Sequence, residues 1–176
     1  MSGWLRRLLG SGVPPGFSGT LAADEHVLGS AELGGGGVLV ATSLGLWLPA
    51  DDGPRRVGWH LISKATWSGG VLTVIEAAED DTAGAAVLIV DLPAHRFVLE
   101  RPGPVPRVVQ ARVTDSIRSR HHHELPGGGA WFVQRKVPGV AGIVLQVRPD
   151  PGTDPSAVHR IAAEVAERIR AAGGVP

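Results

Sequence analysis

Three consecutive histidines, His121-His122-His123, are the residues whose type and spacing most directly suggest chemistry in this chain. On a β-strand, His121 and His123 would project to one face and His122 to the other, because successive side chains alternate. Two imidazoles spaced in this way can share a metal ion. A third ligand would have to come from elsewhere in the chain; the candidates are His95, Asp115 and Glu124. The metal interpretation therefore names His121 and His123. Its alternative is a partly exposed strand end that holds no cofactor.

Basic side chains lie next to these histidines and on the following expected strand. Arg118 and Arg120 precede them, and Arg135 and Lys136 lie on the next segment. If the two strands pair, the four side chains form a cross-strand basic patch. Such a patch would suit an acidic protein partner or an anionic ligand. A solvated face without a ligand is the alternative.

Other patterns that support catalysis are missing from the sequence. A nucleophile elbow needs glycine two residues before and two residues after its serine, and Ser43 has glycine at only one of these positions. The four glycines at 34–37 precede the apolar run Val38-Leu39-Val40, which indicates a strand rather than the helix that follows a phosphate loop. We therefore expect a non-catalytic binding or scaffold protein. The alternative is a small metal-dependent enzyme that uses His121 and His123.

The N-terminal residues offer a third function, which is association with a membrane surface. If this segment is helical, its apolar side chains form one stripe beside Arg6 and Arg7. The stripe consists of Trp4, Leu5, Leu8 and Leu9. A stripe this short buries little area, so only weak membrane association is expected. A frayed or locally docked terminus is the alternative.

Composition and charge exclude several classes of protein. The 176 residues suit one large domain, or a domain of about 100 residues with a smaller annex. The 17 basic and 17 acidic side chains cancel, so the chain lacks the electrostatic attraction of a non-specific nucleic-acid binder. The absence of cysteine excludes disulfides, zinc–thiolate sites and a cysteine nucleophile. No apolar run approaches the roughly 20 residues of a membrane-spanning helix, and no signal peptide is evident, so we predict a cytoplasmic protein.

The expected elements that position these residues are mostly strands. Short segments punctuated by turns are predicted as strands over 26–33, 38–43, 45–49, 55–63, 71–77, 85–92 and 95–101. A helix begins at Val105, and residues 117–125 can extend it or form a strand. Strands over 131–137 and 143–148 follow. The final helix has Asp154 as its N-cap and Pro155 at its first position, and it stops at Gly173-Gly174.

Two segments carry a resemblance to a known family. The stretch Val40-Ala41-Thr42-Ser43-Leu44-Gly45-Leu46-Trp47-Leu48 resembles the turn between the second and third strands of the bacterial pleckstrin-homology-like (GRAM-like) domain. The stretch Arg55-Arg56-Val57-Gly58-Trp59-His60-Leu61-Ile62 is similar to the segment in which such domains return across the sheet. The resemblance implies a binding or scaffolding module with lipid or protein ligands, and it transfers no individual site residue, because the family is defined by its fold.

The C-terminal part of the chain carries a separate resemblance. Gln134-Arg135-Lys136-Val137-Pro138-Gly139 and Val147-Arg148-Pro149-Asp150-Pro151-Gly152 resemble segments in the C-terminal half of actinobacterial proteins of this size.

These observations together predict an α+β fold that is mainly β. We expect a flexible segment over residues 1–20, and then a pleckstrin-homology-like, seven-stranded, partly open barrel or sandwich with its helix over 21–120. A C-terminal ββα extension over 121–176 is expected to pack on this domain. Exposed strand edges in a partial barrel seek pairing, so a homodimer is also expected.

Overall fold

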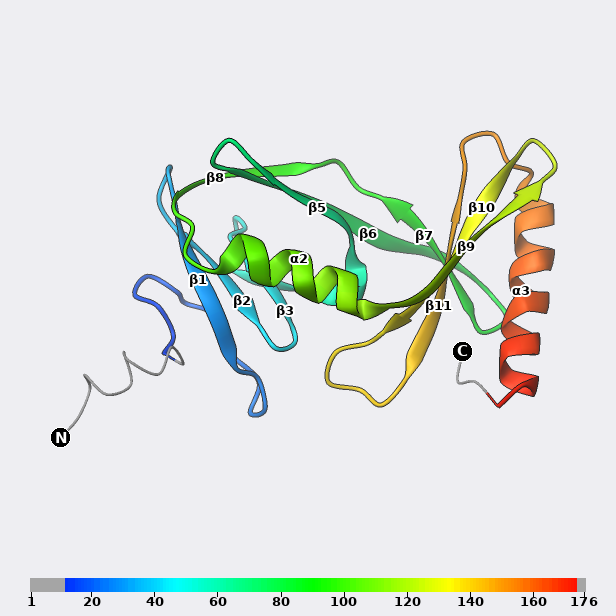
Figure 1. The fold of residues 1–176 in the computed structure, drawn as a ribbon, viewed down its shortest axis with the longest axis horizontal. Helices are drawn as coiled ribbons and strands as arrows, with labels where there is room; N and C mark the ends of the chain where they lie inside the picture. Colours follow the sequence, from blue (N-terminus) through cyan, green and yellow to red (C-terminus); the bar gives the residue numbers. More distant parts are fainter. Residues whose placement is uncertain (1–11, 174–176) are drawn as a thin grey trace. The chain divides into compact units, whose positions relative to one another are not determined.

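The computed structural model describes residues 12–173, and these residues form an α+β structure that is mainly β, as predicted (Figure 1). Contacts divide the chain into two compact units. Among the described residues, unit 1 contains those up to Glu76 together with Pro93–Thr114, and unit 2 contains Ala77–Leu92 together with those from Asp115 onward. No helix among the described residues is long and apolar enough to cross a membrane.

Unit 1 is an antiparallel sheet with one long helix. Its strands are β1 (Val27–Leu33), β2 (Val38–Thr42), β3 (Gly45–Leu48), β4 (Arg55–Gly58), β5 (Ile62–Ser68), residues 71–76 of β6 (Val71–Ala83), and β8 (His95–Arg101). They pair in the order β4-β3-β2-β1-β8-β6-β5. The helix α2 (Val105–Ser116) follows β8.

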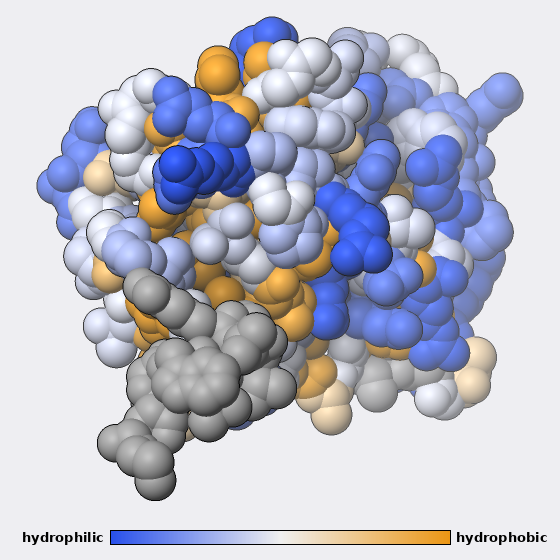
Figure 2. Space-filling model, turned by 60° about the vertical axis from the view of Figure 1, so that its left-hand side comes forward, coloured by the Kyte–Doolittle hydropathy of each residue, from blue (hydrophilic) through white to orange (hydrophobic). Residues whose placement is uncertain are grey.

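The core of unit 1 lies between this sheet and α2. Val105, Val109 and Val113 recur at every fourth position of the helix, so their side chains share one face and are buried. They belong to the same apolar cluster as Leu39, Leu46 and other buried side chains of the strands. Packing of this kind offsets the low helix propensity of the β-branched valines. On the face drawn in Figure 2, hydrophobic residues are exposed between hydrophilic ones.

The strand predicted over residues 55–63 is wrong. The structure has the short strand β4, a 3₁₀ turn over Trp59–Leu61, and the start of β5 at Ile62. The Trp59 indole is buried, and its Nε1 donates a hydrogen bond of 3.0 Å to the Thr42 carbonyl oxygen. The turn therefore places Trp59 in the core, and regular strand alternation cannot continue through it.

Unit 2 is a mixed sheet covered on one face by a helix. It contains the second half of β6, β7 (Ala86–Asp91), β9 (Ile117–Leu125), β10 (Gly128–Lys136), β11 (Ile143–Pro149) and the helix α3 (Pro155–Ala171). The strand order is β6-β7-β11-β10-β9, in which β7 and β11 are parallel and the other pairs antiparallel. Val158, Ala162 and Ala166 of α3 share a core with Phe132 and Leu145.

Several predicted boundaries in this part of the chain can now be compared with the structure. Helix α2 ends at Ser116 and β9 begins at Ile117, so residues 117–125 form a strand. The expected division between residues 120 and 121 falls within β9. The final helix begins as predicted, because Asp154 accepts a hydrogen bond of 3.1 Å from the backbone N–H of Ser156 and Pro155 is the first helical residue.

Candidate functional site

The three histidines divide between the two faces of β9. His122 faces Trp131 in the register of β9 and β10, with the ring centroids 5.1 Å apart, and its Nε2 lies 2.6 Å from Asp150 Oδ2. His121 faces Phe132, and the His123 ring packs edge-on against Phe132 at 4.8 Å.

His121 and His123 are therefore two imidazoles on one face. Within residues 12–173, no group of three or more His, Cys, Asp or Glu side chains could hold a metal ion. Two imidazoles from one chain are fewer than the three or four protein ligands of a typical zinc site. A metal site at this pair stays a prediction.

The predicted basic residues occupy paired strands but have different surroundings. Arg118 and Lys136 are exposed, and the Arg120 guanidinium lies 4.9 Å from the centroid of the Trp131 ring. Arg135 is only 5% exposed, and its Nη1 donates a hydrogen bond of 2.9 Å to Ser116 Oγ. Pairing of β9 with β10 thus leaves Arg118, Arg120 and Lys136 accessible, while Arg135 points into the protein.

Burial has an electrostatic cost at Arg135. Desolvation, and after it the charge of Arg148, lower the pKa of the Arg135 guanidinium to about 10, although Asp91 acts in the opposite direction. A cation with a lowered pKa is one whose charged form the fold disfavours. Arg148 itself pairs with Asp91 at 3.1 Å, so this face of unit 2 mixes cations with carboxylates.

The N-terminal side chains proposed for membrane association are Trp4, Leu5, Leu8 and Leu9. All four lie outside the described residues.

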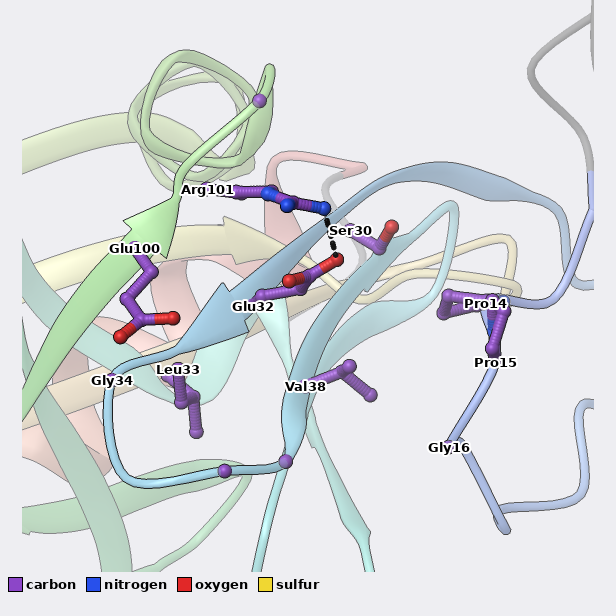
Figure 3. A pocket seen from close by; sticks show the side chains of 13 residues that line it. Pro14, Pro15, Gly16, Ser30, Glu32, Leu33, Gly34, Val38, Glu100 and Arg101 are labelled. Carbon is purple, nitrogen blue, oxygen red and sulfur yellow. Dashed lines mark hydrogen bonds and ion pairs between the residues drawn. The ribbon is translucent and has the colours of Figure 1, made fainter.

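A groove that the sequence did not indicate lies in unit 1. It has a volume of about 640 Å³ and is bounded by the β1–β2 turn, the end of β8 and residues 14–16 (Figure 3). The glycines at 34–37 form that turn: Gly36 N–H donates to the Leu33 carbonyl at 3.0 Å, and Leu33 N–H donates to the Gly37 carbonyl at 3.1 Å. Gly36 and Gly37 have φ values of 90° and 91°, which glycine adopts without strain. The four glycines therefore form a hairpin turn, and a strand follows them, as the sequence indicated.

Two carboxylates and one guanidinium set the charge of this groove. Arg101 Nη1 lies 3.4 Å from Glu32 Oε1, and Figure 3 shows these side chains pointing toward one another, with Glu100 on the neighbouring strand. The Arg101 and Glu32 side chains are 80% and 54% exposed, so water weakens their attraction. Because two carboxylates and only one guanidinium line the groove, its net charge is negative. Leu33 and Val38 add half-buried apolar surface to its lining.

A smaller hollow continues the groove. It has a volume of about 240 Å³ and shares Gly16, Gly37 and Val38 with the larger hollow. Its remaining lining comes from Phe17, Ser18, Pro49, Ala50, Gly53 and Pro54. The two hollows therefore adjoin, and the chain segment at residues 14–18 contributes to both.

The buried carboxylate of Glu25 anchors the chain next to this segment. Its Oε1 accepts hydrogen bonds from Thr42 Oγ1 at 2.6 Å and from Trp47 Nε1 at 2.8 Å. Its Oε2 accepts one from the Ala22 N–H at 3.0 Å and pairs with Arg56. The Phe17 ring packs edge-on against the same Trp47 at 5.3 Å between centroids. Glu25 and Trp47 thus fix the path by which the chain reaches the groove.

These donors determine the charge state of Glu25. Burial alone would raise the pKa of its carboxyl, but the hydrogen bonds from Thr42, Ala22 and Trp47 and the charge of Arg56 outweigh burial and lower the pKa. The fold therefore favours a charged carboxylate at this position. A carboxylate whose oxygens are all engaged in this way is suited to holding structure together rather than to exchanging protons with a substrate.

A second buried carboxylate, Glu76, connects strands that are distant in the sheet of unit 1. Arg55 on β4 donates to both of its oxygens, at 2.8 Å and 2.6 Å, and His95 Nε2 lies 3.5 Å from Oε1. The hydrogen bond to Glu76 raises the pKa of the Arg55 guanidinium. This ion pair therefore joins β4 to β6, which are not neighbours in the sheet of unit 1.

Comparison of the chain with protein-family models, with curated proteins and with solved structures finds no match. The functional assignment therefore depends on the residues of the chain itself. Sequence reasoning missed Glu32, Glu100 and Arg101, because no motif links them and only the pairing of β1 with β8 brings them together.

Proposed function

We propose that this chain is a non-catalytic binding protein, and that the groove of unit 1 accommodates an extended, positively charged segment of a partner protein. The observation that carries the proposal is the groove lined by the carboxylates of Glu32 and Glu100, together with the smaller hollow that adjoins it. Peptide-binding sites commonly combine a preformed groove with a few charged groups that select the ligand.

The charge of the groove gives the proposed ligand its sign. Lysine and arginine side chains form charge-assisted hydrogen bonds with carboxylates, and these are stronger than neutral hydrogen bonds. Glu100 is exposed on β8, and Glu32 is paired with Arg101 through a long, exposed contact. A basic ligand side chain can therefore approach either carboxylate without breaking a buried interaction.

The order of elements in unit 1 supports its interpretation as a pleckstrin-homology-like module. A meander of four strands is followed by a strand pair, a last strand and the helix α2, and the Arg55–Glu76 pair links β4 to β6. Modules of this shape serve as binding or scaffolding domains, although the fold alone does not fix the ligand. We also propose a cytoplasmic location, because the sequence contains no cysteine and no apolar run long enough to span a membrane.

One observation favours a second candidate, which is recognition of an anionic ligand by unit 2. The Arg120 guanidinium lies over the half-buried Trp131, with Arg118 on the same strand. An arginine supported by an aromatic ring is well placed to contact a carboxylate or phosphate. A metal-dependent reaction at His121 and His123, and membrane association through the N-terminal segment, remain alternatives with less support.

Peptide binding tests the leading proposal directly. We would measure fluorescence anisotropy of two labelled peptides of alternating serine and either lysine or glutamate. The lysine peptide should bind, and the Glu32→Gln/Glu100→Gln variant should bind it at least about tenfold more weakly. Added salt should weaken binding to the wild type.

A matched control is available on β6, where Glu79 is exposed outside the groove. Glu79→Gln removes one carboxylate and should leave the affinity unchanged. Equal binding of the lysine and glutamate peptides, or wild-type affinity in the double variant, would contradict the proposal. Binding of the glutamate peptide alone, lost in Arg120→Gln, would favour the anionic candidate.

A further inference from the structure

Strand β9 forms an open edge of the sheet in unit 2. Among the described strands it pairs only with β10. Its side chains from Arg120 to Glu124 are all exposed. An edge strand of this length presents unpaired backbone N–H and C=O groups that another strand can join.

The charges along β9 are complementary to themselves. Arg120, His122 and Glu124 alternate along the strand and so share one face. If two copies of β9 lie antiparallel with His122 opposite His122, then Arg120 of each copy lies opposite Glu124 of the other. A twofold axis produces this ion pair twice. Opposite charges that face each other across strands stabilise their pairing.

We infer that the chain forms a homodimer by antiparallel pairing of β9 with β9 of a second copy, in the register centred on His122. This inference does not depend on the groove of unit 1. The partner is a second copy of this chain because Arg120 and Glu124 lie at equal distances on either side of His122. A twofold axis at His122 therefore places the cation of one copy opposite the anion of the other.

An irregularity in β9 selects this register over its neighbour. The pairing of β9 with β10 shifts between Ser119 and Ile117, which leaves Arg118 as an extra residue. Such a bulge disturbs a strand and blunts its edge. The register centred on His122 pairs residues 119–125 and avoids Arg118. The register centred on His121 would require Arg118 to face Glu124 and would bring the bulge into the ladder.

The same register has a consequence for His121 and His123. His121 of each copy faces His123 of the other copy, on the side of the sheet opposite to His122. Four imidazoles then gather from two chains, which is the number of ligands that tetrahedral zinc takes. One chain supplies only two of them, so the pair becomes a complete set of ligands only in the dimer.

Sedimentation of the full chain over a range of concentrations tests the inference. A single strand pair buries less than a standard interface, so we expect a dissociation constant on the order of 10 µM or weaker. Arg120→Glu and Glu124→Arg should each weaken the dimer at least about tenfold, because each places like charges opposite one another twice. Glu79→Arg, a charge reversal on β6, should have no effect.

An equimolar mixture of the Arg120→Glu and Glu124→Arg variants provides the decisive arm. In the mixed dimer every facing pair again has opposite charges, so dimerisation should return to the wild-type level. Zinc should tighten the wild-type dimer, and His121→Ala/His123→Ala should abolish that effect. A monomeric wild type at all concentrations, two folded variants that fail to restore the dimer on mixing, or a dimer indifferent to zinc would overturn the inference.

Discussion

The two units each bury a charged side chain, and they treat that charge in opposite ways. In unit 1 the Glu25 carboxylate has a fully buried side chain and receives hydrogen bonds from Thr42, Trp47 and Ala22 as well as an ion pair from Arg56. In unit 2 the buried Arg135 guanidinium donates to the neutral hydroxyl of Ser116, and the charge of Arg148 lowers its pKa more than the charge of Asp91 raises it.

Both groups have a lowered pKa, and the meaning differs because one is an acid and the other a base. A lowered pKa for Glu25 means that the fold favours its charged form, whereas a lowered pKa for Arg135 means that the fold disfavours it. The comparison teaches that burial of a charge indicates stabilisation only where the surrounding donors or acceptors compensate for lost water.

The largest expected effect is the loss of stability on changing Glu25. Glu25→Gln keeps the size of the side chain but leaves Arg56 without its charged partner and turns one of two acceptor oxygens, both surrounded by donors, into a donor. Breaking a buried ion pair of this kind costs about 3 kcal/mol. Urea unfolding measures the change, with Glu79→Gln as the control. A loss below about 0.5 kcal/mol, typical of a surface substitution, would contradict the structural role of Glu25.

The pH dependence of the same variant sharpens the comparison. Because the folded-state pKa of Glu25 lies below its ordinary value of 4.5, the unfolded chain takes up this proton first as the pH falls. The contribution of Glu25 is therefore fully present above that value and is lost as the pH falls through the folded-state pKa. The stability difference between wild type and Glu25→Gln should narrow in acid. A difference that stays constant from neutral to acidic pH would show that Glu25 does not carry the charge described.

A smaller effect is expected at Arg135, in spite of its burial. Arg135→Met removes a cation that the fold disfavours and fills the space with an apolar chain, while Ser116 loses one hydrogen bond. Because burial disfavours the charged form of Arg135, the free energy of unfolding should change by less than about 1 kcal/mol. The same urea experiment measures it. A loss as large as that of Glu25→Gln would mean that the two buried charges do not differ.

The smallest effect on stability is expected at Arg101, whose pairing with Glu32 is long and exposed. Arg101→Gln should change the free energy of unfolding by less than about 0.5 kcal/mol. It should nevertheless tighten binding of the lysine peptide a few-fold, because the groove then keeps two carboxylates without a competing cation. Weaker binding by this variant would show that Arg101 itself contacts the ligand.

Local signals made the final helix predictable from the sequence. Asp154 and Pro155 specify its start through backbone geometry, and the apolar residues Val158, Ile161, Val165 and Ile169 follow the helical period. The 3₁₀ turn at Trp59 could not be predicted in the same way. This turn is accompanied by the burial of Trp59 and by its hydrogen bond to Thr42, which is remote in sequence.

In the candidate sites, too, local features could be predicted from the sequence and long-range contacts could not. Alternation along β9 correctly separates His122 from His121 and His123, because it is a property of any strand. The burial of Arg135 and the contact of Glu32 with Arg101 depend on which elements pack together, and no short-range pattern encodes that. Carboxylates looked alike in the sequence, yet Glu25 is enclosed by donors and Glu100 faces solvent.

The most direct test of the proposed function is an NMR titration of the ¹⁵N-labelled full chain with the lysine peptide. If the groove of unit 1 is the binding site, amide signals of the β1–β2 turn, Glu100 and Arg101 should shift together and saturate at one peptide per chain. Shifts confined to β9, β10 and β11, or no saturable shifts at all, would contradict the proposal that unit 1 recognises a basic segment.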